Sequence, residues 1–396
     1  MYLSKLIQKG YYHFFLRWRK RIFISNIEAI GSHSDKKALL YYMTDPFWNK
    51  SLTKSYIHTN YWEITEIVRI LNQAGYTVDI LDRSVNDIDF IENKYNVFIG
   101  NGSGDSGKLY PDIAKKLKNA VCIFYATSTE PRIGNMLTEH RYEMFKNRTG
   151  INAKPMRIRR YVDINRAIEV TNAIMNVSTS KNIYSTKSYL QYRKPIYCVH
   201  PSTSPKIVFH KQWLENRERS SFLCISGNGF IHKGVDLLVE AFIREPNMTL
   251  HIIGPDTERA FFDAYKDVIK NTPNIHYHGF IKIGGKKFNQ LARKCSWVIS
   301  HSAHESCSTS VITGMKAGLV PVINEETSVD IGDFGISLGN NNDLSIGLIT
   351  DKIKSISAIE KNEYKDRVLS TLASANQYTQ NEFRRTFKKA LREIIS

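Results

Sequence analysis

The sequence predicts an α/β protein with two consecutive Rossmann-like domains, and three observations support this prediction. Its 396 residues exceed the size of one typical domain. Short apolar runs typical of buried parallel strands alternate with segments that carry apolar residues at helical spacing. The alternation occurs in two series, which a polar stretch from Pro201 to Arg219 separates. Because parallel strands need crossover connections, each series is expected to form a sheet covered by helices on both faces.

The first series predicts six strands. They lie at Lys37 to Thr44, Thr77 to Leu81, Asn96 to Ile99, Val121 to Thr127, Ala173 to Ser178 and Ile196 to His200. A long polar connection follows the first strand, and a helix is expected to begin after His58-Thr59-Asn60. Its apolar residues between Ile64 and Leu71 share one face, and Gly75 marks its end.

The second series predicts five strands and four helices. The strands lie at Phe222 to Ser226, Thr249 to Ile253, Ile275 to His278, Trp297 to Ser300 and Leu319 to Ile323. The helices lie at Val235 to Ile243, Arg259 to Ile269, around Phe288 to Ala292, and from Ser308, a good N-cap, to Gly318. A closing helix is expected over Glu382 to Ile395, where apolar residues form one stripe.

The formal net charge of +17 favours an anionic partner: phosphorylated substrates, an anionic membrane or nucleic acid. Met1 to Ile22 contains six Lys and Arg residues, no acidic residue, and interleaved aromatic and apolar side chains. This composition is typical of a basic helix on an anionic bilayer, with a solvated or domain-packing helix as the alternative. It differs from a secretory signal because its longest apolar run ends at Arg17. Nucleic acid is disfavoured, since the basic residues are densest in this terminal segment.

Cysteine usage and hydropathy indicate the compartment. The five cysteines lack metal-type spacing, and four sit in or beside apolar runs, which is typical of buried free thiols in a reducing compartment. No later stretch has the length and apolarity of a spanning helix. We therefore expect a cytoplasmic protein that lies peripherally on the inner face of the cell membrane.

Glu305 stands between a predicted strand and the predicted helix that begins near Ser308. The N-terminus of a helix presents free backbone N–H groups and a positive dipole end, which together make an anion site. A carboxylate just ahead of it can accept hydrogen bonds from hydroxyl groups attached to that anion. The pair suits a phosphate-linked polyol.

The stretch from Trp297 to Ile323 resembles the signature of retaining GT-B glycosyltransferases of family 4, the glycosyl transferases of group 1. In that signature a Glu is followed eight positions later by a second Glu on the helix; here these positions hold Glu305 and Thr313. The resemblance implies that Glu305 holds the donor sugar and that residue 313 contacts the nucleotide ribose. A Thr hydroxyl replaces a charge-assisted bond with a neutral one.

A second motif, Gly227-Asn228-Gly229-Phe230-Ile231-His232-Lys233-Gly234, follows a strand and opens a helix. Its glycines let the backbone approach a ligand, and Lys233 is placed to reach a diphosphate. The family has Arg where Asn228 stands and Lys where Lys233 stands. Breaking a sugar–nucleotide bond leaves negative charge on the diphosphate, and without a metal ion cationic side chains must stabilise it. Lys233 and Glu305 are therefore the expected catalytic residues, and no essential metal or cofactor is expected.

The remaining site predictions fall into two groups. By resemblance, the donor is expected to contact Gly227, Asn228, Gly229, Phe280, Ile281, Ser308, Thr309, Ser310 and Thr313. Because open α/β sheets bind ligands at the carboxyl ends of their strands, the acceptor is expected to contact His58, Asn60, Gly102, Ser103, Gly104, Glu130 and Arg132.

Two other motifs have weaker explanations. Gly102 to Lys108 matches P-loop spacing, but Leu109 stands where a Ser or Thr would bind magnesium, so a glycine loop near the acceptor is preferred to an NTPase site. Asp87-Ile88-Asp89 resembles a metal-binding triplet of GT-A enzymes, yet the apolar residues after it favour a short turn.

The reading that the resemblance implies is a GT-B enzyme with four segments. They are a basic amphipathic segment (1–35), an acceptor domain (36–205), a nucleotide-sugar domain (206–375) and a helix that crosses back to the first domain (376–396). It would be a retaining hexosyltransferase using a UDP- or GDP-sugar, and the basic N-terminus indicates a saccharide or lipid-linked acceptor from bacterial surface polysaccharide or glycolipid assembly. The alternatives are an epimerase or phosphorylase with the same fold, or a non-catalytic binder of sugar nucleotides or nucleic acid.

Overall fold

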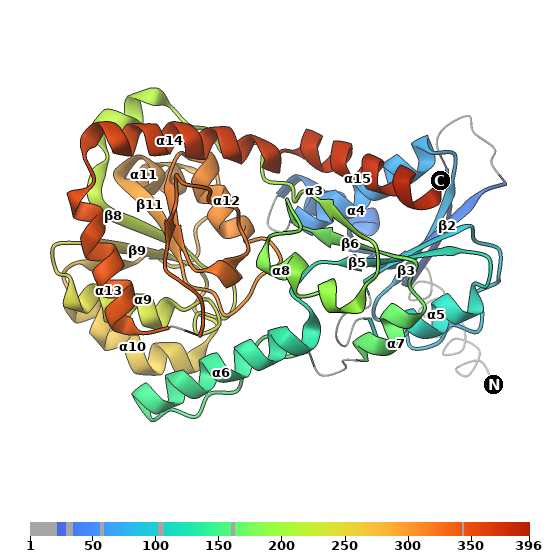
Figure 1. Ribbon diagram of the computed structural model, residues 1–396, viewed down its shortest axis with the longest axis horizontal. Coiled ribbons are helices and arrows are strands. Elements are labelled where there is room, and N and C mark those ends of the chain that lie inside the picture. Colours follow the sequence, from blue (N-terminus) through green and yellow to red (C-terminus); the bar gives the residue numbers. More distant parts are fainter. Residues whose placement is uncertain (1–21, 29–34, 56–58, 102–106, 160–162, 343) are drawn as a thin grey trace, which may run out of the picture.

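A computed structural model describes residues 22–28, 35–55, 59–101, 107–159, 163–342 and 344–396. It has two lobes, each with one sheet flanked by helices (Figure 1). The basic segment Met1 to Ile22 lies outside the described residues except for Ile22. Every helix in the described part of the chain is too short or too polar to span a bilayer.

The N-terminal lobe contains a seven-stranded sheet in the order β1-β3-β2-β4-β5-β6-β7. Its strands are β1 (Phe23–Ile27), β2 (Lys37–Tyr42), β3 (Thr77–Asp82), β4 (Val97–Gly100), β5 (Val121–Ala126), β6 (Ala173–Val177) and β7 (Ile196–Val199). All neighbours are parallel except β1, which pairs antiparallel with β3. Strand β1 was not predicted from the sequence, because residues 1–35 were interpreted as one basic segment. Phe23, Ile24 and Ile27 instead pack on the core of this lobe.

The helices that precede the second half of the chain are α2 (Asp45–Trp48), α3 (Ser51–Ser55), α4 (Thr59–Gln73), α5 (Tyr110–Lys116), α6 (Pro131–Thr149), α7 (Ile164–Glu169) and α8 (Tyr184–Lys187). The short helices α2 and α3 occupy what was expected to be a polar connection. The predicted face of α4 is buried, and Pro111 stands in the first turn of α5, where its missing N–H costs nothing.

The C-terminal lobe contains a six-stranded parallel sheet in the order β10-β9-β8-β11-β12-β13. Its strands are β8 (Glu218–Ile225), β9 (Thr249–Ile253), β10 (Ile275–Tyr277), β11 (Cys295–Ser300), β12 (Val320–Ile323) and β13 (Ile336–Ser337). Its helices are α9 (Val235–Arg244), α10 (Arg259–Asn271), α11 (Lys286–Lys294), α12 (Thr309–Lys316), α13 (Ile346–Ser355) and α14 (Lys361–Ala375). In the sheet order β8 and β11 are neighbours, so the loops at their carboxyl ends meet.

Two helices cross between the lobes (Figure 1). The last helix, α15 (Gln380–Ile395), buries Phe383, Phe387 and Leu391 in the core of the N-terminal lobe. Helix α6 crosses in the other direction and buries Tyr142 and Phe145 in the core of the C-terminal lobe. The boundary placed near residue 205 therefore leaves α6, which precedes it in sequence, packed on the second sheet.

Glu63 of α4 joins the N-terminal lobe to the start of the connection between the lobes. It is 4% exposed and accepts hydrogen bonds from the backbone N–H and the hydroxyl of Ser202, both at 2.8 Å. Burial raises the pKa of Glu63 to about 7 from its usual value of 4.5. The folded protein therefore keeps a proton that the unfolded chain has already released, and stability falls as pH rises from about 4.5 to about 7.

Glu63→Gln is expected to remove this loss while keeping an acceptor for Ser202. The free energy of unfolding of the variant, relative to the parent protein, should rise by about 3 kcal/mol from the acidic to the alkaline end of that range. Urea unfolding at about pH 5 and about pH 8 measures the difference. Glu143→Gln, which changes an exposed acid on α6, is the control. Parallel pH curves for Glu63→Gln and the parent would contradict this role.

Candidate active site

Lys233 lies in the turn between β8 and α9, at the carboxyl end of the sheet. The turn closes on Gly234, whose φ is +70°. A Cβ added to Gly234 would lie 2.2 Å from the carbonyl oxygen of His301, just after β11, so a larger residue would separate the two loops. This close approach brings Lys233 against the loop that carries Glu305.

Glu305 lies in the loop between β11 and α12, where both lobes hold its backbone. Its N–H donates to the carbonyl of Glu326, and its own carbonyl accepts from the Thr129 hydroxyl of the N-terminal lobe at 2.9 Å. The next residue, Ser306, donates its hydroxyl to the carbonyl of Val177 at the end of β6. The Glu305 carboxylate is therefore positioned where the two lobes meet.

Lys233 and Glu305 form an ion pair through Nζ and Oε1, with side-chain exposures of only 9% and 15%. Arg157 approaches the same carboxylate oxygen through Nη1, at 3.7 Å. Burial lowers the pKa of Lys233 well below its usual range, and the charge of Arg157 adds to this effect. The contact with Glu305 acts in the opposite direction and favours the charged amine.

Helix α12 begins beside this ion pair, with Ser308 at its N-cap and Thr309 and Ser310 in its first turn. Its first backbone N–H groups have no partner within the helix, as at any helix start. They point out of the N-terminal end of α12, into which the loop with Glu305 leads. Thr313 lies one turn further on, is 9% exposed, and donates its hydroxyl to the carbonyl of Thr309 at 2.7 Å. That hydroxyl oxygen can still accept a bond from a ribose, but its proton is used within the helix.

The other predicted donor contacts differ in accessibility. Gly227 and Asn228 are exposed, and Asn228 accepts a bond from the Thr257 hydroxyl at 3.1 Å. Phe280 is 68% exposed, whereas Ile281 is 8% exposed and packs in the hydrophobic core. The buried side chain of Ile281 therefore cannot contact a nucleotide base, and a contact at this residue would have to use its backbone.

The predicted acceptor residues do not form one cluster among the described residues. His58, Gly102, Ser103 and Gly104 lie outside the described part. Asn60 donates to the Tyr42 hydroxyl at 2.7 Å. The carboxylate of Glu130 is fully buried, caps α6 by accepting from the Ile133 N–H, and also accepts from Arg132 and Tyr192. Glu130 therefore binds Arg132, Tyr192 and the start of α6, and its carboxylate is fully buried.

Three residues that lie where the lobes meet were not predicted from the sequence. Arg157 reaches Glu305, as described above. Arg141 of α6 is 1% exposed and donates to the His301 carbonyl and to Asn341 Oδ1, both at 2.7 Å. His304 is buried beside His232, with ring centroids 4.8 Å apart, and burial lowers the pKa of His304 well below its usual range. No motif marks Arg141 or Arg157, because α6 and the segment after it are the elements that change lobes. His304 directly precedes Glu305, but nothing in its sequence position shows that its ring is buried beside His232.

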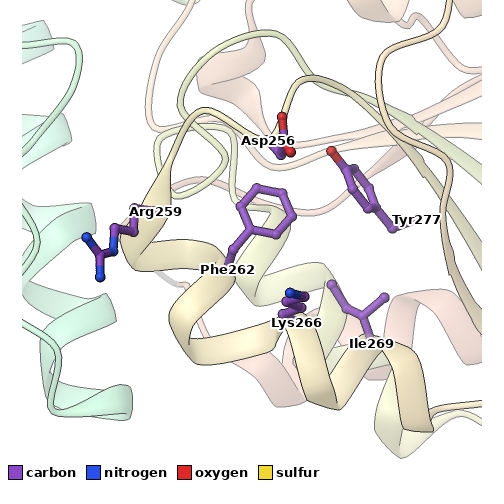
Figure 2. Close-up of a pocket in the computed structure, with 6 residues that line it drawn as sticks. All are labelled: Asp256, Arg259, Phe262, Lys266, Ile269 and Tyr277. Carbon is purple, nitrogen blue, oxygen red and sulfur yellow. The ribbon is translucent and has the colours of Figure 1, made fainter.

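A separate hollow of about 310 Å³ lies along α10 of the C-terminal lobe (Figure 2). Its lining is Asp256, Arg259, Phe262, Lys266, Ile269 and Tyr277. It includes none of the predicted site residues. The ring of Phe262 also packs against Phe230 of the Lys233 turn, with centroids 5.4 Å apart.

Comparisons with known proteins match part of the C-terminal lobe to a family and both lobes to a fold. Residues 208–329 match the family model of glycosyl transferases group 1. Anabaena HepE, solved with UDP and glucose, aligns with a TM-score of 0.57 at 12% identity, over 91% of this chain and 100% of its own. Sucrose-phosphate synthase from Thermosynechococcus elongatus aligns with a TM-score of 0.61 at 10% identity, over 91% of this chain and 99% of its own.

Some matching structures are considerably longer. Pneumococcal O-GlcNAc transferase GtfA, solved with UDP and GlcNAc, aligns with a TM-score of 0.52 at 15% identity over 76% of this chain, which spans 57% of the GtfA chain. No curated protein matches the sequence. The family match spans both Lys233 and Glu305, and the structural matches extend over both lobes. The chain thus has the GT-B fold, and its residues 208–329 match the family of glycosyl transferases group 1.

Proposed function

We propose that this protein is a retaining glycosyltransferase that moves a hexosyl group from a nucleotide-diphosphate sugar to an acceptor hydroxyl. The observation that supports this proposal most directly is the contact of Lys233 with Glu305 at the start of α12. A cation, a helix N-terminus and a carboxylate then face one region, which suits a diphosphate joined to a sugar. HepE and GtfA were both solved with UDP, which favours UDP over GDP as the carrier.

The proposed reaction exchanges one bond at the anomeric carbon for another. The bond from this carbon to the terminal phosphate oxygen breaks, and its electron pair stays on the diphosphate. The acceptor oxygen bonds to the same face of the carbon, and its proton passes to the departing phosphate. Lys233 and the first N–H groups of α12 stabilise the growing negative charge, while Glu305 holds the sugar hydroxyls. No metal ion or cofactor is part of this proposal.

The acceptor is proposed to be a saccharide or a lipid-linked saccharide of bacterial surface polysaccharide assembly, met at the inner face of the cell membrane. The basic composition of Met1 to Ile22 supports this part of the proposal. Co-sedimentation with vesicles, with and without anionic lipid, should show stronger binding of the full-length protein to anionic vesicles than of a form that starts after Ile22. Equal sedimentation of both forms with anionic vesicles would contradict membrane attachment.

Nucleotide release tests the central proposal. Full-length protein is incubated with UDP-, GDP- and ADP-sugars, with and without a panel of saccharides, and free nucleotide and sugar products are measured. We expect one carrier to give slow hydrolysis that an acceptor accelerates. An altered sugar still attached to its nucleotide would indicate an epimerase, and phosphate-dependent release of a sugar phosphate would indicate a phosphorylase. Binding without any turnover would indicate a non-catalytic protein.

A further inference from the structure

Arg157 lies where the Lys233 turn, Glu305 and the N-terminal lobe come together. Its Nη1 is 3.7 Å from Glu305 Oε1. Its Cδ and Cγ lie 3.6 Å and 3.7 Å from the position that a Cβ on Gly229 would take. The side chain therefore lies against the glycine that follows Asn228, and its guanidinium group extends to the carboxylate that Lys233 also contacts.

The backbone on both sides of Arg157 is fixed to α6. The N–H of Met156 donates to the Tyr142 hydroxyl at 3.2 Å. Asn135 exchanges two hydrogen bonds with the backbone of Arg159, at 2.8 Å and 2.9 Å. Upstream, Ile151 and Ala153 pack on the core of the C-terminal lobe. The segment thus holds Arg157 in place before any ligand binds, which reduces the entropy that a ligand contact would cost.

The charges around Arg157 favour a further anion. Arg157 and Lys233 contact one carboxylate, and Arg159 is a third positive charge that acts on Arg157's surroundings. Glu258 is the other acid that acts on Arg157. Both Glu258 oxygens are already engaged, one by the Tyr142 hydroxyl and the other by the Ile231 N–H at 2.9 Å. The Arg157 side chain is 41% exposed, and its guanidinium group stays charged and can bind two phosphate oxygens at once.

We propose that Arg157 is the second cation that binds the diphosphate of the donor, in the role that an Arg at position 228 would fill. This inference rests on the proposed function, because it assigns a residue to the same donor site. Asn228 is exposed on the neighbouring loop and carries no charge. The second cation therefore comes from the segment after α6, which precedes the group 1 domain in sequence.

Calorimetric titration of full-length variants with UDP and with uridine tests the assignment. Arg157→Ala is expected to weaken UDP binding by about 10- to 100-fold, as for the loss of a hydrogen bond between charged groups. Uridine binding should stay unchanged, because uridine lacks phosphate. The UDP affinity of Arg157→Lys should lie between those of the parent protein and Arg157→Ala. In the Arg157→Ala protein, Asn228→Arg should restore a substantial part of the UDP affinity by returning a cation to the adjacent loop.

Arg244→Ala, which removes an exposed arginine at the end of α9, is the matched control. Melting temperatures of all variants identify any that fail to fold; Arg157→Lys, which keeps the charge and the side-chain stem, carries the test if Arg157→Ala is unfolded. UDP affinity equal to that of Arg244→Ala would overturn the assignment, and so would equal losses for UDP and uridine. Failure of the parent protein to bind or turn over any nucleotide sugar would instead contradict the proposed function.

Discussion

Lys233→Ala is expected to lower kcat for sugar transfer by about 10²- to 10³-fold, the usual cost of removing one group that stabilises a developing anion. Lys233 is the most buried cation at the ion pair, with 7% exposure, so solvent cannot replace its charge. The loss should fall on kcat because the negative charge on the diphosphate grows as the bond to the sugar breaks. UDP affinity should fall as well, since the product carries this charge in full.

The measurement is steady-state transfer and UDP titration with the same preparation. Lys316→Ala is a matched control, because Lys316 is a partly buried lysine at the far end of α12. It should leave kcat within about twofold of the parent. Transfer at the parent rate by Lys233→Ala would remove the lysine from the reaction and with it the main support for the proposed mechanism.

The sequence located Lys233 and Glu305 because both follow strands of one parallel sheet. Residues at the carboxyl ends of neighbouring parallel strands meet at one edge, and β8 and β11 are neighbours. Their places after strands and the family resemblance predicted both residues, and the sheet order brings them together although they lie 72 positions apart, as the difference between 305 and 233 shows. The ion pair between them is the result.

Arg157 could not be found in this way, because it belongs to no strand of the second sheet. It reaches the site only because α6 leaves its own lobe and buries Tyr142 and Phe145 in the other core. The helical pattern of α6 does not indicate which sheet its apolar face packs against, because each lobe contains a sheet. The capping role of Glu130 was not predicted for a related reason: its place after β5 suggested a ligand contact, and in the structure its side chain caps α6.

Substitution of Glu305 should affect sugar binding and diphosphate binding differently. Glu305→Ala is expected to lower kcat/KM for the nucleotide sugar by about tenfold to a thousandfold, the range for losing one or two hydrogen bonds to a charged acceptor. UDP has no transferable sugar, and the carboxylate repels its phosphates. The variant should therefore bind UDP as well as the parent or more tightly, in contrast to Lys233→Ala, which should bind UDP more weakly.

Glu305→Gln is the control for loss of folding in Glu305→Ala. Removing one member of a buried ion pair leaves the other charge uncompensated and commonly destabilises a protein by about 3–5 kcal/mol. Glutamine keeps a carbonyl oxygen for Lys233 and Arg157, so its melting temperature should lie closer to that of the parent. Its loss of transfer should nonetheless resemble that of Glu305→Ala, because a neutral amide accepts weaker bonds from sugar hydroxyls. Equal weakening of UDP and nucleotide-sugar binding in both Glu305 variants would show that Glu305 only supports the loop. If instead UDP affinity falls in Lys233→Ala but stays equal or rises in Glu305→Ala, the lysine binds the phosphates and the carboxylate binds the sugar.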